Sequence, residues 1–220
     1  MLKALNLLFS PEAEWQKTAL KPPHFATVLF LSILPLMAAA LAVEGYSLVK
    51  YGEMFRGLAQ RAVSHERAVK YELFYGVASL LAMLFGGRLL RNVGKTFNLE
   101  ASYAVCFILI AFGYFPLLLV RLMDALPQIN TWICWAVGAA LSFRILYHGI
   151  ALWLRPEQTK GFGLLLVSFV YILVISAVIH FAAIQVLQGR FLKNIYEPKG
   201  NSTPSLTAAR KSGELARMVE

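Results

Sequence analysis

Arg144 and His148 are the residues whose type and spacing most suggest chemistry in this sequence. They lie four positions apart within an apolar stretch, so a helix would place both side chains on one face. A cation at such a depth costs about 2.5–3.5 kcal/mol to insert unless it is paired or hydrated. Three roles for Arg144 stay open: an ion pair with Glu100 that fixes helix register, a polar cavity or ion path, and snorkelling to the membrane surface.

A second intramembrane histidine, His180, lies deep in the last apolar run. Paired histidines on neighbouring helices could ligate a haem or relay protons. Helical rise, however, puts His148 and His180 roughly 13 to 20 Å apart in depth, which is too far for one haem iron. Interhelical hydrogen bonds are the simpler interpretation. Neither cysteine has metal-ligand spacing, so the sequence predicts no metal and no cofactor.

Sequence patterns of catalysis are missing. The chain has no nucleophile elbow, zincin helix, phosphate loop or dinucleotide fingerprint. No pair of carboxylates is expected inside the membrane, so a proton pump or cation site built on carboxylates has little support. Arg121 and Asp124 are interpreted as a solvated pair at a helix end. We therefore predict no catalytic residue and a protein that is not an enzyme.

Composition sets the class of protein that must hold these residues. Of 220 residues, 58% are hydrophobic and 15% are charged, and the mean hydropathy is +0.61; soluble domains carry roughly 25% charged residues. The net charge of +9 comes from basic residues beside apolar runs, where lipid headgroups attract them, so no nucleic-acid partner is expected. The sequence predicts an all-α, polytopic membrane helix bundle with five transmembrane helices and a short N-terminal amphipathic helix.

The predicted organisation has three parts. Residues 1–24 form an interfacial arm, 25–190 the transmembrane domain, and 191–220 a flexible polar tail. Basic residues number eight on each side of the predicted bundle, so charge alone does not orient it. The five spans are predicted at about 25–43, 73–90, 101–123, 129–154 and 161–189.

Aromatic residues and caps suggest the depth of these helices. Trp132 and Trp153 are 21 residues apart, or about 31 Å along a helix, which matches a hydrocarbon core with an aromatic belt on each side. In the arm, Ser10 and Pro11 suit a helix start, and Trp15 is expected in the headgroups. The mixed-charge segment 44–72 is predicted to be a helical extension or an interfacial helix.

Proline and small residues indicate how the helices bend and meet. Pro35 and Pro116 each remove a backbone donor within a predicted span, so kinks are expected there. Gly138, Ser142 and Gly76 have the small side chains that let two helix backbones approach closely. We predict helix contacts at these three positions.

Four short motifs and their order among the predicted spans are typical of one family of membrane proteins. These motifs are Ser10-Pro11-Glu12-Ala13-Glu14-Trp15, Gly113-Tyr114-Phe115-Pro116, Tyr147-His148-Gly149 and Arg155-Pro156-Glu157. With them the sequence resembles the Yip1 family of five-span membrane proteins, in its bacterial form, over roughly residues 8 to 190. The resemblance implies a cytosolic N-terminus and a location in the bacterial inner membrane. Eukaryotic relatives bind small GTPases, but the long acidic arm and Asp-Leu-Tyr-Gly-Pro-like motif of those relatives are not found here, which argues against such a partner.

Two functional hypotheses follow. The first is a non-enzymatic integral membrane protein that binds partner membrane proteins, or itself, and organises a membrane complex or a trafficking-like process. An accessory subunit of a larger assembly is one form of this hypothesis. The alternative is a small-solute or ion transporter or channel with a polar cavity around Arg144 and His148. The small-residue helix faces and the missing catalytic patterns favour the first hypothesis.

Overall fold

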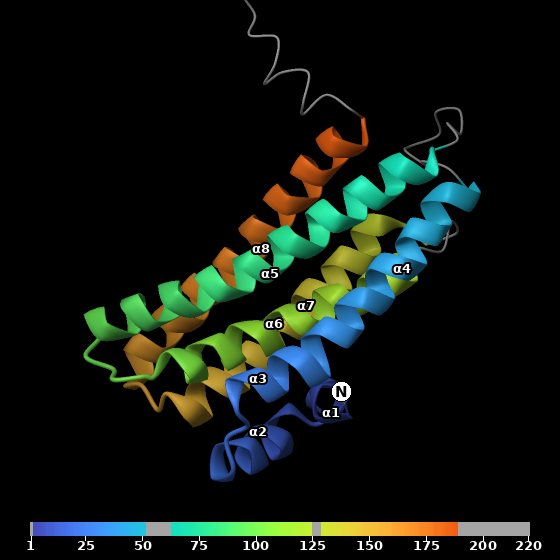
Figure 1. The fold of residues 1–220 in the computed structure, drawn as a ribbon. Helices are drawn as coiled ribbons and strands as arrows, with labels where there is room; N and C mark the ends of the chain where they lie inside the picture. Colours follow the sequence, from blue (N-terminus) through green and yellow to red (C-terminus); the bar gives the residue numbers. More distant parts are fainter. Residues whose placement is uncertain (1, 52–62, 125–128, 189–220) are drawn as a thin grey trace, which may run out of the picture.

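The computed structural model describes residues 2–51, 63–124 and 129–188, which form a helix bundle with no strand among them (Figure 1). In chain order the elements are α1 (Leu2–Phe9), α2 (Pro11–Leu20), α3 (Phe25–Val28), the π-helical turn η1 (Leu29–Ile33), α4 (Leu34–Tyr51), α5 (His65–Thr96), α6 (Tyr103–Asp124), α7 (Thr131–Trp153) and α8 (Gln158–Leu187). Within these described ranges, five helices are long and apolar enough to cross a membrane: Phe25–Tyr51, His65–Thr96, Tyr103–Met123, Thr131–Trp153 and Lys160–Leu187. The predicted all-α bundle with five spans is confirmed.

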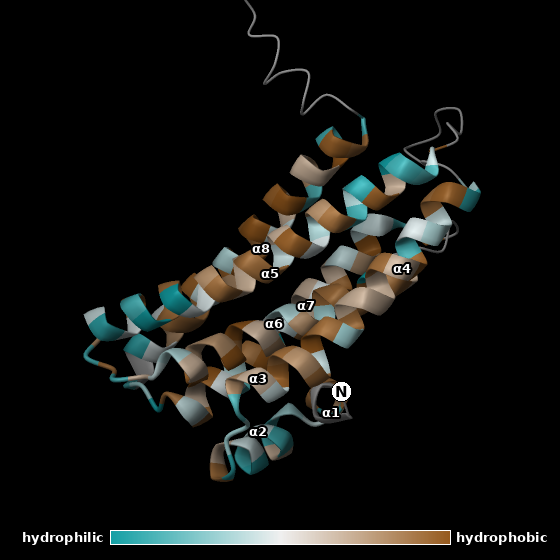
Figure 2. Ribbon diagram, in the orientation of Figure 1, coloured by the Kyte–Doolittle hydropathy of each residue, from teal (hydrophilic) through white to brown (hydrophobic). Residues whose placement is uncertain are grey.

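Helix α6 is the centre of the bundle. It contacts α4, α5, α7 and α8, and 78% of its most apolar stretch is buried, against 33–44% in the other four spans. Its buried side chains include Phe107, Ile110 and Phe115. The outer helices expose apolar side chains such as Phe85 and Phe181, which suits contact with lipid. Figure 2 shows hydrophobic residues along the middle of the long helices and hydrophilic ones towards their ends.

The first two spans extend further than the uncharged runs predicted. The helix that begins at Phe25 continues to Tyr51, and α5 already begins at His65. Residues 44–51 and 65–72, expected as an extension or an interfacial helix, therefore belong to the spans themselves. Residues 52–62 lie outside the described residues, as does the tail predicted over 191–220.

The N-terminal arm folds onto the bundle as two helices, α1 and α2. Pro11 occupies the first turn of α2, and α2 ends at Leu20, just before Pro22-Pro23. Trp15 is fully buried, which corrects the expectation that its ring lies in the headgroups. The physical reason is that α2 packs along α7, where the Trp15 indole donates a hydrogen bond to the Ile145 carbonyl at 3.0 Å.

The two prolines within spans have different local settings. The π-helical turn Leu29–Ile33 ends two residues before Pro35, whose ring and missing N–H disturb the α-helical hydrogen bonds of the preceding turn. Helix α6 remains helical on both sides of Pro116.

Small residues lie where helices of this chain cross. A Cβ on Gly138 would lie 2.9 Å from the Leu117 side chain of α6, and one on Gly76 would lie 2.7 Å from Leu41 of α4. Ser142 is fully buried, and its hydroxyl donates to the Gly138 carbonyl at 2.8 Å. The Gly138 and Ser142 positions thus belong to packing inside the chain.

Candidate functional site

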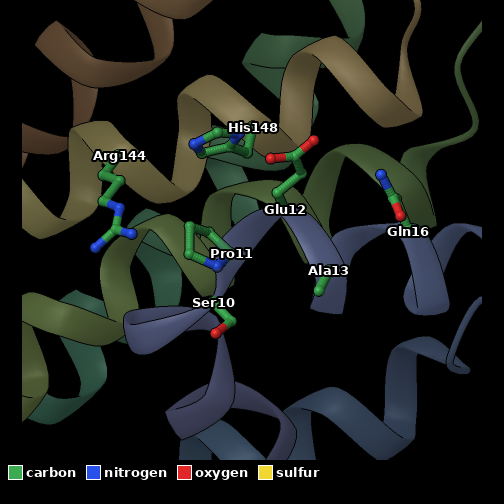
Figure 3. A pocket seen from close by; sticks show the side chains of 7 residues that line it. All are labelled: Ser10, Pro11, Glu12, Ala13, Gln16, Arg144 and His148. Atoms are coloured by element: carbon green, nitrogen blue, oxygen red, sulfur yellow. The ribbon is translucent and has the colours of Figure 1, made fainter.

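Arg144 and His148 line one recess between α7 and the first turns of α2 (Figure 3). This recess has a volume of about 500 Å³, and we call it the α2–α7 recess. Arg144 is exposed and His148 is half-buried. The lining residues are Ser10, Pro11, Glu12, Ala13, Gln16, Arg144 and His148.

Packing of Trp15 holds α2 against α7 and so shapes the recess. The Trp15 ring meets Phe112 and Trp153 edge-on, with centroids 5.6 and 5.3 Å apart. Gly149 makes room for it, because a Cβ there would lie 2.8 Å from the indole ring. With this face of α2 buried, Glu12 and Gln16 lie on its exposed side and line the recess.

Arg144 has a different partner from the one predicted. Its guanidinium donates to the Leu8 carbonyl, near the end of α1, at 3.4 Å. Glu100 is exposed in the connection before α6, and no ion pair between Glu100 and Arg144 occurs among the described residues. The two residues lie in different places. Helices α1 and α2 occupy the side of α7 that Arg144 faces, whereas Glu100 precedes the first residue of α6, Tyr103.

The two histidines are in separate places. His148 lines the recess, with its ring 5.3 Å from that of Tyr147. His180 lies on α8, where its ring is 6.0 Å from Phe181. The part of the chain that the structure describes has no group of three or more His, Cys, Asp or Glu side chains that could hold a metal ion.

The α2–α7 recess offers four polar groups for ion pairing and hydrogen bonding. These are the guanidinium of Arg144, the imidazole of His148, the carboxylate of Glu12 and the amide of Gln16.

A second polar site is buried between α4, α5 and α6, and sequence reasoning missed it. Arg121 pairs with Glu44 of α4 and Glu72 of α5, and only 6% of Arg121 is exposed. We call Glu44, Glu72 and Arg121 the ionic cluster. It corrects two predictions: Arg121 is not a solvated residue, and two carboxylates do lie together inside the spans. The Asp124 side chain lies outside the described part.

The hydrogen bonds of the ionic cluster are specific. Arg121 donates through Nε to Glu44 Oε2 and through Nη2 to Glu72 Oε2, the latter at 3.0 Å. The Tyr71 hydroxyl donates to Glu44 Oε1 at 2.9 Å. The guanidinium carbon lies 3.3 Å from the centre of the Tyr75 ring, a cation–π contact. Removing one member of such a buried pair typically costs about 3–5 kcal/mol.

Some buried polar atoms of the ionic cluster have no hydrogen-bond partner among the described residues. These are Glu72 Oε1 and Arg121 Nη1. The buried hydroxyl of Tyr114 on α6 lies near the hydroxyls of Tyr75 and Ser79 on α5, but it forms no hydrogen bond with a described residue. A short polar track therefore leads from the ionic cluster towards the apolar core.

One sequence signal could have revealed the ionic cluster. Glu44 directly follows the first uncharged run, Glu72 directly precedes the second, and Arg121 directly follows the third. Alternating spans bring these three ends to the same side of the membrane. Treating each charge as the end of a span hid the possibility that the charges pair.

Five packed helices that are long and apolar enough to cross a membrane, with an N-terminal arm docked on them, define a polytopic helix-bundle membrane protein. The family model of the Yip1 domain matches residues 5–180. The chain belongs to the Yip1 domain family, as the resemblance of its motifs indicated. Comparisons with curated proteins and with solved structures give no match.

Proposed function

We propose that this protein is a non-enzymatic integral membrane protein that binds partner membrane proteins and organises a membrane complex. Membership of the Yip1 domain family, which is usually implicated in membrane trafficking, supports a role in a trafficking-like process. An accessory subunit of a larger assembly fits the same proposal. The observation that carries it is the α2–α7 recess.

The recess has the chemistry of a docking place for a polar segment. It combines Arg144 and His148 with the carboxylate of Glu12 and the amide of Gln16. A partner that offers both donors and acceptors could satisfy these groups at once, as polar residues do at protein interfaces. Because α2 forms one wall, a partner held there would also contact the docked arm.

Packing of the core favours binding over conduction. On α6, the buried residues between the recess and the ionic cluster are large and mostly apolar, among them Leu109, Phe112 and Phe115. A solute crossing the bundle would have to displace them. This packing is the reason that we rank transport second.

Site-specific photocrosslinking in native membranes tests the proposal. Ala13 and Ala19 are both exposed on α2, but only Ala13 lines the recess. A photoreactive residue at position 13 should yield a discrete crosslinked membrane protein, identified by mass spectrometry after gentle purification, and the same probe at position 19 should not. A crosslink to a second copy of the chain would identify self-association. Equal yields from both positions, or none from either, would contradict binding at the recess.

Transport of a small solute is the second candidate, because Arg144 and His148 do line the same recess. If the protein carries an anionic solute, the Arg144→Met variant should lose uptake in reconstituted vesicles while keeping its thermal unfolding midpoint. Full flux in that variant would remove this candidate. For its location, we propose the bacterial inner membrane with the N-terminus in the cytosol, on the basis of the family resemblance.

A further inference from the structure

The ionic cluster contains more negative than positive charge. Two carboxylates, Glu44 and Glu72, share the single guanidinium of Arg121, which leaves one formal negative charge if both acids are ionised. Arg121 is 6% exposed and Glu72 is 7% exposed. An uncompensated charge at such depth is strongly unfavourable, and buried groups commonly neutralise instead.

Among the residues that the structure describes, no second cation faces Glu72 to balance this charge. The charged groups facing Glu72 are Glu44 from α4 and Arg121 from α6. The titratable neighbours of the cluster are the hydroxyls of Tyr71 and Tyr75 on α5 and of Tyr114 on α6. On α8, the apolar side chains of Ile179, Ala183 and Leu187 pack on this part of α5.

Hydrogen bonds distinguish the two carboxylates. Both oxygens of Glu44 accept a hydrogen bond, Oε1 from Tyr71 and Oε2 from Arg121. Only Oε2 of Glu72 accepts one, from Arg121, whereas its Oε1 is buried without a donor among the described residues. Donors stabilise an ionised carboxylate, and Glu72 has one donor where Glu44 has two.

Packing around Glu72 adds to this difference. A Cβ on Gly45 of α4 would lie 3.2 Å from Glu72 Cγ and 3.9 Å from Glu72 Oε1, so the free oxygen lies against α4. A helix backbone and apolar side chains solvate a charge far less well than water does.

We propose that the ionic cluster is a proton-binding site, in which Glu72 carries the proton and Glu44 stays ionised as the counter-ion of Arg121. The proton comes from the aqueous phase and binds Oε1, so the formal charge of the cluster changes from minus one to zero. In this state each of the three helices α4, α5 and α6 contributes one member of a neutral site. Glu72 is then the group whose proton loss would place an unbalanced charge between the helices.

Infrared spectroscopy of the full-length protein in lipid vesicles at neutral pH tests the proposal. A protonated carboxylic acid has a C=O stretching band separate from the carboxylate bands. We expect this band in the wild type and its loss in Glu72→Gln. We also expect its loss in Glu44→Gln, because Glu72 must then ionise to balance Arg121. Glu72→Asp keeps an acid at the site and should shift the band instead of abolishing it.

Glu66→Gln is the matched control, because Glu66 lies on the same helix but is exposed and paired with Lys70. This variant should retain the band. Glu72→Gln should also keep the wild-type thermal midpoint, since glutamine has the shape and charge of the protonated acid. Absence of the band from the wild type overturns the proposal, and that result needs no folded variant. A band that survives in Glu72→Gln, or a midpoint in Glu72→Gln as low as that of Arg121→Leu, overturns the assignment to Glu72.

Discussion

Arg121 carries its charge where water scarcely reaches, so its contribution depends on its partners. Two neighbouring helices supply these partners: α4 contributes Glu44, and α5 contributes Glu72 and the Tyr75 ring. Taking an ion pair out of water is costly, and the attraction between the partners roughly offsets that cost. The ionic cluster therefore specifies which helix ends meet more than it adds net stability.

Arg121→Leu should lower the free energy of unfolding by about 3–5 kcal/mol, because it leaves the Glu44 carboxylate without its cation beside Glu72. A thiol-reactive fluorescent dye can follow thermal unfolding, since the thiols of Cys106 and Cys134 are both buried. Arg88→Leu is the control, because Arg88 is exposed on α5. An unchanged midpoint for Arg121→Leu would show that the cluster is dispensable.

Individual residues were predictable to different degrees. The four-residue spacing of Arg144 and His148 placed them on one helix face, and both do line one recess. The pairing of Arg121 depends on which helices are neighbours, which one-dimensional charge counting does not contain. The burial of Trp15 likewise depends on a surface of α7 that exists only after folding.

At the scale of helices, glycines decide how closely the spans approach. The closest approach to a backbone is at Gly87 of α5, where a Cβ would lie 2.8 Å from the Cα of Phe107 on α6. Backbone atoms there cannot move aside without shifting a whole helix. The α5–α6 crossing is thus intolerant of even one methyl group.

Gly87→Ala should lower the free energy of unfolding by about 1–3 kcal/mol through overpacking. Gly94→Ala on the same helix is the comparison, since the nearest atom to its Cβ, the Leu99 carbonyl oxygen, is 3.7 Å away. That variant should be neutral or slightly stabilised, because alanine favours a helix. Equal effects of the two substitutions, measured by the same dye assay, would contradict the close crossing.

Gly149→Ala should loosen the docking of α1 and α2, because the new methyl group would lie 2.8 Å from the Trp15 ring. Trypsin should then cut faster at Lys17, an exposed residue of α2 whose cleavage requires local unfolding. Gly163→Ala, whose Cβ would lie 3.6 Å from Phe97, should leave the cleavage rate unchanged. If Gly149→Ala resists trypsin like the wild type, α2 does not depend on this contact.

For the molecule as a whole, orientation is the property to measure. The first span separates Lys21 from Ser64, both exposed, and the native cysteines are buried. With a cytosolic N-terminus, an impermeant maleimide should label Ser64→Cys in intact cells, and Lys21→Cys only after the membrane is opened. The reverse pattern would contradict the proposed orientation. Labelling of both from one side would contradict a crossing by the first span.

The overall architecture was largely predictable because length and hydropathy decide how many helices a bilayer accepts. The ends of the spans were less predictable than their number. The mixed segment from Glu44 to Tyr51 remains helical, because a helix does not stop where it leaves the apolar layer. Helix α5 likewise begins before its uncharged run, just after Ser64, whose backbone carbonyl accepts hydrogen bonds from the N–H groups of Arg67 and Ala68.

The order of charges in the ionic cluster has a consequence for biogenesis. A ribosome delivers Glu44 and Glu72 to the membrane before Arg121, because they precede it in the chain. When the third span leaves the insertion machinery, its arginine meets two carboxylates already in place, which offsets the insertion cost of about 2.5–3.5 kcal/mol for a lone cation. A nascent chain arrested after α5 would instead hold two acids in the bilayer with no counter-ion, a state that quality-control proteases could recognise.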